Sequence, residues 1–251
     1  MDLRDATTDD AAQIRSVAER SMTASYGHAI DESTMADAVE EWYDGETVSD
    51  AVEDEEAVFV VAVDDGEVVG FVQAYVSTGQ VVVGEIDWLH VVPEHRGEGI
   101  GTQLLKRVEQ VLSDRGVDLI EGRVLTDNEA GGEFYAEQGY EEASERTVGI
   151  GGEEFEEVEY VKRLGDEGEG ALTEERTTED GTTVYVAYDD AVRGSRAPFY
   201  AVYTDEERTE RYGWMCGQDE SFDVAMDTME RIECNTCRNR RKAARWDAAY
   251  L

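Results

Sequence analysis

An apolar segment, a glycine-rich turn and an amphipathic stretch follow one another directly between residues 82 and 115. Residues 82–92 predict a strand, and the glycines Gly97, Gly99 and Gly101 mark the turn. From residue 99 to 115 apolar residues recur at helical spacing. A helix that begins at such a turn directs several unpaired backbone N–H groups at one point, which suits a phosphate or pyrophosphate group. A simple glycine turn is the alternative interpretation.

Two common nucleotide motifs do not fit this turn. The phosphate-binding string Gly-x-x-x-x-Gly-Lys-Ser/Thr does not occur in the sequence. A dinucleotide fingerprint would need Gly-x-Gly-x-x-Gly directly after the strand. Here Gly97 and Gly99 fit, but the third position is Thr102 and a hairpin precedes the strand. The sequence therefore disfavours a dinucleotide-binding domain.

The segments around this turn predict alternating helices and strands up to residue 164. A strong hairpin signal, Asp65-Gly66, joins two apolar runs. The helices expected outside the turn region span residues 9–22, 33–43 and 128–138. The remaining strands are expected at residues 3–6, 119–125, 147–150 and 157–164. Hairpins combined with one strand–helix–strand crossover predict a mixed α/β fold, that is, an α+β arrangement around a mixed sheet.

A glycine- and acid-rich segment at residues 165–170, GDEGEG, contains no apolar residue and predicts a flexible linker. We therefore expect one domain over residues 1–164, a linker over 165–171 and a second, small β-rich domain over 172–251.

The charge of the chain limits its surroundings and partners. The sequence has 60 acidic and 22 basic residues, and only three of the latter are lysines. Long apolar runs argue against disorder. The balance is typical of a protein adapted to very high salt, where carboxylate repulsion is screened. It also argues against nonspecific nucleic-acid binding.

The sequence offers no sign of secretion or membrane insertion. No run approaches the roughly 20 apolar residues that a membrane span requires. The acidic start of the chain lacks the basic and apolar blocks of a signal peptide. We therefore expect a cytoplasmic protein without a membrane partner.

Two segments together resemble the GNAT acetyltransferase superfamily. Arg96-x-x-Gly99-x-Gly101 after an apolar strand matches the family motif Arg/Gln-x-x-Gly-x-Gly/Ala, within the segment VPEHRGEGIGTQLL. The later segment LTDNEAGGEFYAEQGY resembles the family's strand–Asn–helix–Tyr–Gly continuation, and the element order agrees across residues 1–164. The resemblance implies the GNAT acyltransferase fold and transfer of an acetyl group from acetyl-CoA to an amine.

The resemblance also implies the residues that would bind acetyl-CoA. The turn would hold the pyrophosphate mainly through backbone N–H groups, and its residues are Arg96, Gly97, Gly99, Ile100, Gly101 and Thr102. The backbone of Leu89 and Val91 would pair with the pantetheine arm, because the strand diverges from its neighbour in this family. Asn128 would help to position the cofactor.

Acetyl transfer needs a proton donor for the leaving thiolate and a base for the amine. Tyr135 lies where family members place a tyrosine that protonates the CoA sulfur; a Tyr packed on the sheet is the alternative. Glu85 matches best the glutamate that some relatives use through water, and Asp87 is the other candidate. In so acidic a chain, a carboxylate without a catalytic role is an equally open interpretation.

The acceptor is an amine of a small molecule or a protein, which the sequence does not identify. In this family it enters between the first two helices and the later strands, so Tyr26, Trp42 and Tyr43 are candidates to line its site. Two other functions stay open. One is a CoA-binding or regulatory module without catalysis, and the other is an acetyltransferase directed to nucleic acid or a partner by the C-terminal domain.

All three cysteines of the chain lie in the second domain, where three short β-branched and aromatic runs predict a small antiparallel sheet. Cys234 and Cys237 have the two-residue gap that lets two thiolates bind one zinc ion, and Cys216 and Asp219 have the same gap. A zinc site of these four residues is the prediction. A redox pair or metal-free buried thiols are the alternatives. The module resembles small zinc-ribbon-like domains of unassigned function in haloarchaeal proteins.

The segment 231–245 is rich in arginine and lysine and contains one acid, Glu233. It would contact nucleic acid or an acidic partner, or pair with carboxylates of this chain, and we favour the last interpretation.

Overall fold

The computed structural model describes residues 1–77, 81–150, 153–164, 173–178, 180–226 and 231–241. These residues form two compact units. Of the described residues, the N-terminal unit contains 1–76 and 84–164, and the C-terminal unit contains 77, 81–83 and those from 173 to 241. The predicted linker at 165–171 lies outside the described residues, as do Lys242 and Arg245 of the predicted basic segment.

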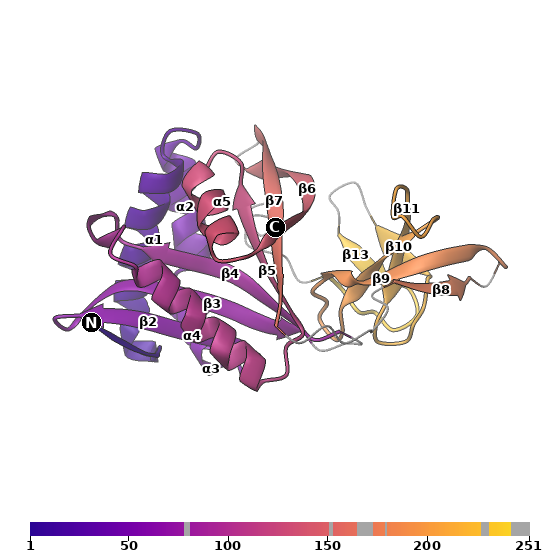
Figure 1. Cartoon of the computed structure of the whole chain (residues 1–251), viewed down its shortest axis with the longest axis horizontal. Coiled ribbons are helices and arrows are strands. Elements are labelled where there is room, and N and C mark those ends of the chain that lie inside the picture. The colour runs from indigo at the N-terminus through magenta and orange to yellow at the C-terminus, as the bar shows by residue number, and fades with distance from the viewer. Residues whose placement is uncertain (78–80, 151–152, 165–172, 179, 227–230, 242–251) are drawn as a thin grey trace. The chain divides into compact units, whose positions relative to one another are not determined.

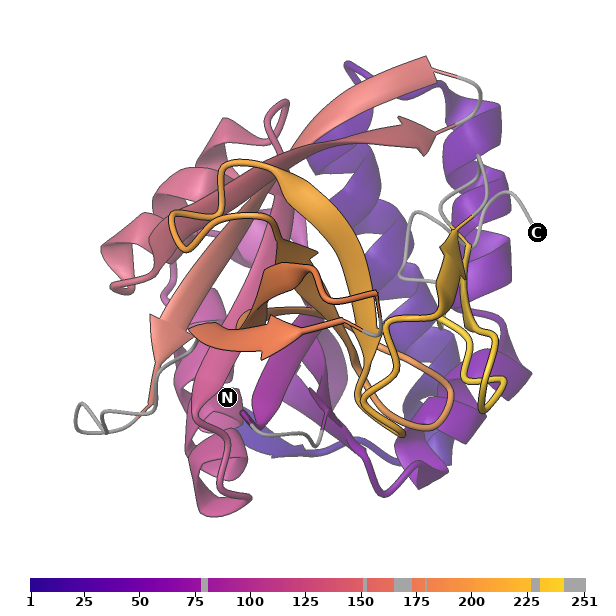
Figure 2. The same cartoon turned by 90° about the vertical axis from the view of Figure 1, so that its right-hand side faces the viewer.

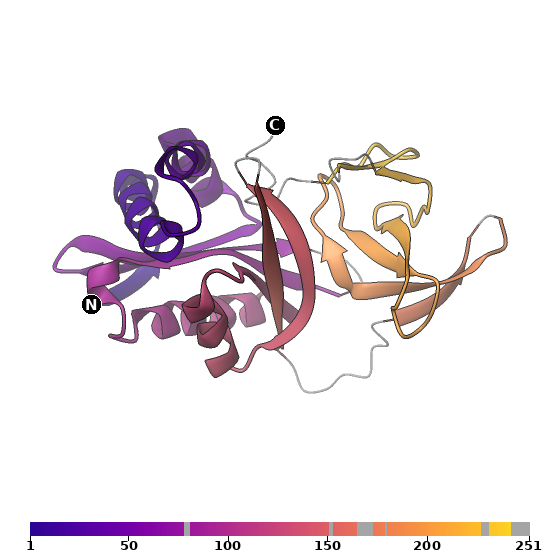
Figure 3. The same cartoon turned by 90° about the horizontal axis from the view of Figure 1, so that it is seen from above.

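A seven-stranded sheet forms the middle layer of the N-terminal unit (Figure 3), with the strand order β1-β2-β3-β4-β5-β7-β6. Its strands are β1 (Asp2–Asp5), β2 (Ala57–Asp64), β3 (Glu67–Ser77), β4 (Val83–Val91), β5 (Leu119–Leu125), β6 (Glu141–Ile150) and β7 (Glu153–Arg163). The predicted hairpin is confirmed: β2 and β3 pair antiparallel, and Asp65 and Gly66 between them have φ angles of 48° and 86°. The mixed α/β prediction is confirmed as well.

Helices cover both faces of this sheet. They are α1 (Ala11–Tyr26), α2 (Glu32–Trp42), α3 (Gly45–Glu53), α4 (Ile100–Asp114) and α5 (Glu129–Glu137), with short 3-10 turns η1 (Thr8–Asp10) and η2 (Pro93–His95). Figure 3 shows α1 and α2 on one face and α4 and α5 on the other. The helix α3 is absent from the sequence prediction, because its stretch is short and acidic. The Asp44 carboxylate starts it by accepting hydrogen bonds from the N–H groups of Glu46 and Thr47.

The apolar faces of these elements meet in cores that exclude water. As predicted, α4 buries Ile100, Leu104, Leu105, Val108 and Leu112 toward the sheet.

The strands β6 and β7 begin earlier than predicted, at Glu141 and Glu153. Their first halves are exposed and rich in glutamate, so the apolar alternation that reveals a strand is missing there.

The C-terminal unit contains a four-stranded antiparallel sheet with the order β11-β10-β9-β8 and a separate two-stranded ribbon. The strands are β8 (Thr173–Thr177), β9 (Thr183–Val192), β10 (Phe199–Tyr203), β11 (Arg211–Cys216), β12 (Val224–Met226) and β13 (Ile232–Cys234). Figure 2 shows the β12–β13 ribbon in yellow and the larger sheet in orange. The three predicted strands are β9, β10 and β11, so the predicted antiparallel sheet is confirmed.

Two small apolar clusters hold this unit together. One lies on the sheet and contains Val184, Val186, Tyr188, Tyr200, Val202 and Met215. The other joins the sheet to the ribbon and contains Phe199, Cys216, Ile232 and Cys234. Two of the three cysteines are therefore part of the apolar packing between two sheets.

Among the described residues of the whole chain, no helix is long and apolar enough to cross a membrane.

Candidate functional site

The glycine turn between β4 and α4 has a conformation that leaves backbone donors exposed. Gly97 and Gly99 have φ angles of 79° and 80°, which L side chains rarely adopt. Among the described residues, no side chain caps α4, and the N–H of Gln103 donates to the Gly99 carbonyl at 3.1 Å. The N–H groups before Gln103, from Ile100 to Thr102, therefore have no acceptor inside the helix. An anion at this helix start would supply one.

Gly101 differs from the other two glycines of the turn, because it lies against neighbouring side chains. A Cβ at this position would lie 3.4 Å from the Phe134 ring and 3.6 Å from a Leu89 methyl group. Within the described part of the chain, a Cβ at Gly97 or Gly99 would meet no atom within 4 Å. A Cβ at Gly101 would therefore only touch α5 and β4 at ordinary contact distance, while Gly97 and Gly99 are needed for the path of the backbone.

The side chain of Arg96 fastens this turn to α1. Its guanidinium donates to the carbonyl and the hydroxyl of Ser21, each at 3.0 Å, and to the Ser25 hydroxyl at 3.1 Å. Its Nε also donates to the Val91 carbonyl at 3.2 Å. Partial burial lowers the pKa of Arg96. The Arg96 side chain thus fixes the turn to α1 and β4 without using the backbone N–H groups of the turn, which remain available to a ligand.

The turn stands where two central strands separate. The ribbons of β4 and β5 leave the same corner of the sheet and diverge toward the turn and α5 (Figure 1). Leu89 and Val91 lie near the end of β4, directly before the turn. Their predicted role beside the pantetheine arm is compatible with this place.

Asn128 starts α5. Its side-chain oxygen accepts a hydrogen bond from the Gly131 N–H at 3.1 Å, and its amide nitrogen donates to the Tyr26 hydroxyl at 3.2 Å. Tyr26 ends α1, which covers the opposite face of the sheet from α5 (Figure 3). Asn128 therefore connects a helix on one face of the sheet to a helix on the other.

Tyr135 lies on α5 and is 6% exposed. Its ring stacks on Tyr160, with 5.6 Å between ring centroids, and meets Tyr140 edge-on at 5.0 Å. The Tyr135 hydroxyl reaches the backbone of β5, because a Cβ at Gly122 would lie only 2.7 Å from it. Gly122 therefore opens the sheet surface for this hydroxyl, beside the divergence of β4 and β5. The sequence analysis missed Gly122, although a glycine inside a strand often marks such an approach.

A cluster of buried charges lies on the other face of β5. Side chains alternate along a strand, so Arg123 points away from the face that Gly122 offers to Tyr135. Its guanidinium forms ion pairs with Glu85 of β4, Glu121 of β5 and Glu159 of β7, the last at 2.9 Å. Arg123 is 10% exposed. Burial acts against its charge, but these carboxylates outweigh burial and raise the pKa of Arg123.

The predicted base, Glu85, is therefore held by Arg123, a residue that the sequence analysis missed. The three carboxylates that pair with Arg123 come from three separate strands. Their meeting depends on the order of the strands in the sheet, so no local pattern in the sequence indicates it. The alternative base, Asp87, is half-buried two residues further along β4. The structure brings Tyr135 and Glu85 to opposite faces of the sheet on either side of β5.

The aromatic residues expected to line the acceptor site mostly pack in the core. Tyr43 is 1% exposed and contacts Phe71 edge-on, and Trp42 packs on Trp88 with 5.3 Å between ring centroids. Tyr26 is buried and holds Asn128. Tyr26 is thus in direct contact with a predicted cofactor residue.

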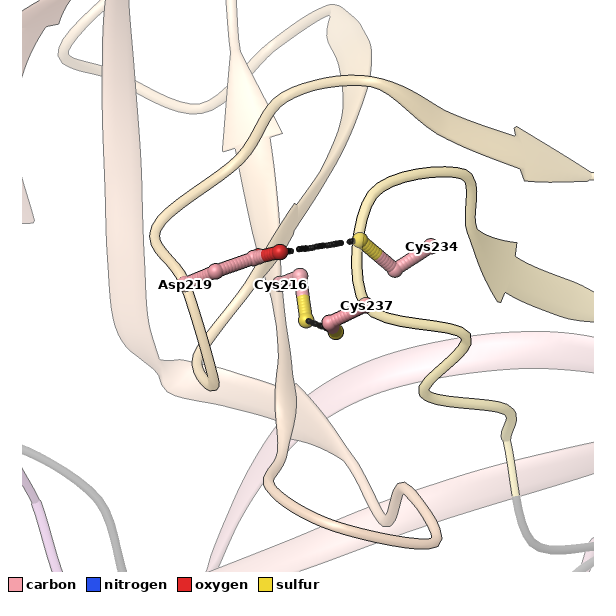
Figure 4. Close-up of side chains that lie close together, drawn as sticks. All are labelled: Cys216, Asp219, Cys234 and Cys237. Atoms are coloured by element: carbon pink, nitrogen blue, oxygen red, sulfur yellow. Dashed lines mark hydrogen bonds between the residues drawn. The ribbon is translucent and has the colours of Figure 1, made fainter.

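The four predicted metal ligands converge in the C-terminal unit. Cys216 ends β11 and Asp219 lies in the turn after it, while Cys234 ends β13 and Cys237 lies in the next turn (Figure 4). Their three sulfur atoms and a carboxylate oxygen all lie within 4.8 Å of one another. Burial raises the pKa of Cys216 to about 12. Burial would also raise the pKa of Asp219, but hydrogen bonds from the thiols and from the Ser221 N–H together outweigh it and lower that pKa.

The described part of the basic segment pairs with this chain's own carboxylate. Arg238 and Arg240 form ion pairs with Glu233 at 3.1 Å and 3.0 Å. The interpretation that this segment pairs internally is thus supported for two of its arginines.

Comparisons with known proteins agree with the geometry of the N-terminal unit. Residues 15–140 match the model of the acetyltransferase (GNAT) family, and residues 180–251 match a family of unknown function, DUF5816. A mycothiol acetyltransferase from Kytococcus sedentarius is 34% identical over 141 residues, which are 54% of this chain. The match spans 43% of that relative's length.

Solved structures share the fold of this unit. The PaiA N-acetyltransferase from Thermoplasma acidophilum, in complex with coenzyme A, superposes with a TM-score of 0.56 at 20% identity, over 65% of this chain and 98% of that one. The ribosomal-protein-S18-alanine N-acetyltransferase from Escherichia coli gives 0.52 at 18% identity, over 67% and 97%. Since the family model covers half of the sequence and the fold agrees, this chain belongs to the GNAT acetyltransferase family.

Proposed function

We propose that this protein transfers the acetyl group of acetyl-CoA to an amine. The observation that carries the proposal is the uncapped start of α4 behind Gly97 and Gly99, next to the place where β4 and β5 diverge. The relative from Kytococcus sedentarius is named an acetyltransferase, and the neighbour from Thermoplasma acidophilum was solved with coenzyme A.

In this proposal the cofactor is bound mainly by backbone groups. The N–H groups of the turn and of the first turn of α4 hold the pyrophosphate, because they point at one place and lack acceptors within the helix. The pantetheine arm lies along the backbone of Leu89 and Val91. Asn128 orients the cofactor with the second N–H of its amide, because its oxygen accepts from Gly131 and its first N–H donates to Tyr26.

The chemistry divides between the two faces of β5. The lone pair of a neutral amine attacks the thioester carbon, the C–S bond breaks, and the departing thiolate takes a proton from the Tyr135 hydroxyl. The amine loses its proton to Glu85 through a water molecule, and proton exchange with solvent restores both side chains. Asp87 is the alternative base. Gly122 supports the role of Tyr135, because it lets the hydroxyl approach the sheet beside the diverging strands.

The cofactor site is tested by a substitution in the turn. Gly99→Glu places a negative charge and a strained backbone at the pyrophosphate position, so CoA binding measured by calorimetry should be lost. Gly116→Glu is the matched control, because Gly116 has a φ angle of 77° and meets no described atom within 4 Å, yet lies after the opposite end of α4. Retained CoA affinity in Gly99→Glu would contradict the placement of the cofactor.

The activity itself is tested by incubating the chain with acetyl-CoA and a panel of small-molecule and peptide amines in molar KCl. Release of free CoA thiol that depends on the amine supports the proposal. Tight CoA binding without turnover on any amine would instead favour a CoA-binding module without catalysis.

The proposal includes the setting in which the enzyme works. The excess of 60 acidic over 22 basic residues suits a cytoplasm with very high salt, because screening then removes most of the repulsion between carboxylates.

A further inference from the structure

The four convergent side chains of the C-terminal unit belong to no part of the acetyltransferase machinery. They come in two pairs, Cys216 with Asp219 and Cys234 with Cys237, and each pair joins the last residue of a strand to a residue of the turn after it. The pairs are separated along the chain, and the fold alone brings them together (Figure 4). A carboxylate surrounded by three thiols is a set of donors that suits a metal ion.

Two of the six separations between the donor atoms are close to the edges of a tetrahedral zinc site, and all six are within 4.8 Å. With Zn–S near 2.3 Å and Zn–O near 2.0–2.2 Å, a tetrahedron has S···S edges of about 3.8 Å and S···O edges of about 3.5 Å. The Cys216 and Cys237 sulfurs are 3.6 Å apart. The Cys234 sulfur lies 3.5 Å and 3.6 Å from the two oxygens of Asp219. These atoms are too far apart for a disulfide, whose S–S bond is about 2.0 Å, and close enough to share one ion.

The surroundings of the cluster support a bound ion. Cys216 and Cys234 are fully buried between the sheet and the ribbon, whereas Asp219 is exposed, so an ion could enter from the side of the carboxylate. The fully buried Asn239 donates from its amide nitrogen to the Cys216 sulfur at 3.5 Å and to the Ala197 carbonyl at 2.7 Å. A donor fixed in this way orients a sulfur ligand from outside the metal's own coordination shell.

We infer that Cys216, Asp219, Cys234 and Cys237 bind one zinc ion, which joins the turn after β11 to the turn after β13. Three thiolates select a borderline or soft metal over magnesium or calcium. All four positions around the ion are filled by side chains, which is the arrangement of a structural site rather than a catalytic one. The C-terminal unit would then gain stability from zinc binding, because binding of a structural metal is coupled to folding.

The first test is the metal content of the full chain, purified without chelator from a medium that contains zinc and iron. Elemental analysis should give about one zinc per chain. Iron in place of zinc, or a folded chain without metal, would overturn the inference. Mass spectrometry without reductant would show two missing hydrogens if a cysteine pair were oxidised to a disulfide, and that result would overturn it as well.

The second test counts the ligands. The metal-free full chain is titrated with cobalt, whose absorption in the near ultraviolet reports thiolate ligands, and zinc affinity is measured against a competing chelator. We expect a tetrahedral cobalt spectrum with three thiolates. An octahedral spectrum, or no binding by a metal-free chain that keeps its fold, would contradict the site.

Asp219 is tested by two substitutions with opposite expected effects. Asp219→Ala should weaken zinc binding by at least the roughly 10- to 100-fold that loss of a mere supporting contact costs. Asp219→Cys should bind more tightly and add a fourth thiolate to the cobalt spectrum. The control Glu207→Ala removes an exposed carboxylate of the same unit and should leave the affinity unchanged. Equal affinities in all three variants would exclude Asp219 as a ligand and overturn the four-residue site.

Discussion

The two units contain polar clusters of opposite design. In the N-terminal unit, Glu85, Glu121 and Glu159 surround Arg123, so the chain supplies the cation that its buried carboxylates need. In the C-terminal unit, the ligand atoms of three cysteines and Asp219 lie within 4.8 Å of one another, and all four groups would be negative when deprotonated. The first cluster contains its own counter-charge, whereas the second would receive its counter-charge from the proposed zinc ion. The comparison predicts that the two units respond differently to the same treatments.

Metal removal should produce the largest difference between them. When a strong chelator acts on the full chain, we expect the backbone amides of β11 and β13 to lose their protection against hydrogen exchange, because zinc binding to a structural site is worth on the order of 10 kcal/mol. Protection in β2, β3 and α4 should not change. Mass spectrometry of exchanged peptides reports both units in one experiment. Unchanged protection of β11 and β13 in a chain shown to be free of metal would break the comparison.

Removal of the internal cation should be the next largest effect, and it should be confined to the N-terminal unit. Arg123→Met leaves the buried Glu121 and the half-buried Glu85 and Glu159 without their partner and should lower the free energy of unfolding by about 3–5 kcal/mol. Denaturant unfolding, monitored by hydrogen exchange of peptides from each unit, measures this loss of free energy of unfolding. Arg20→Met, which breaks the exposed pair between Arg20 and Glu94, should cost no more than about 1 kcal/mol. Equal losses in the two variants would show that the cluster around Arg123 is not a buried ion network.

Loss of the proposed proton donor should affect catalysis without affecting either cluster. Tyr135→Phe removes only the hydroxyl, so turnover should fall by about 100-fold or more while CoA affinity and zinc content stay the same. Tyr140→Phe is the control, because it removes a neighbouring buried hydroxyl that donates to Glu109. A similar fall in turnover for both variants would point to packing of the aromatic cluster as the cause.

Salt should have the smallest and most graded effect, again unequal between the units. Residues 1–165 carry 40 acidic and 11 basic residues, and residues 166–251 carry 20 and 11. Raising KCl to molar concentration shortens the Debye length to about 3 Å and should stabilise the more highly charged N-terminal unit more. Each kcal/mol of relieved repulsion corresponds to a rise in Tm of roughly 2–4 °C. Calorimetry on the zinc-loaded chain measures this, and equal shifts of both transitions would contradict it.

Local patterns explain why part of the fold was predictable. The hairpin at Asp65-Gly66 and the helix α4 follow from two adjacent turn residues and from regular apolar spacing. The exposed beginnings of β6 and β7 are rich in glutamate, and the strands of the ribbon are three residues long, so neither shows an apolar period. In an acid-rich surface strand, backbone hydrogen bonds form the strand although the sequence shows no alternation of apolar residues.

The candidate sites divide in the same way. The turn at Gly97 and Gly99 and the paired spacing of the cysteines are local in sequence, so they could be recognised before the structure was known. Arg123 meets Glu85 and Glu159 across three strands, and no pattern along the chain links positions so far apart. The space that Gly122 leaves for Tyr135 depends in turn on where α5 packs.

The hydrogen bonds of Arg96 to α1 have a consequence for which substitutions this protein can tolerate. Because its guanidinium is bound to Ser21 and Ser25, the proposed anion site at the start of α4 consists of main-chain donors, which every residue except proline supplies. Neither pH nor the chemical identity of most neighbouring side chains alters those donors. The proposed cofactor site should therefore tolerate most side-chain substitutions around it, as long as Gly97 and Gly99 keep their backbone angles.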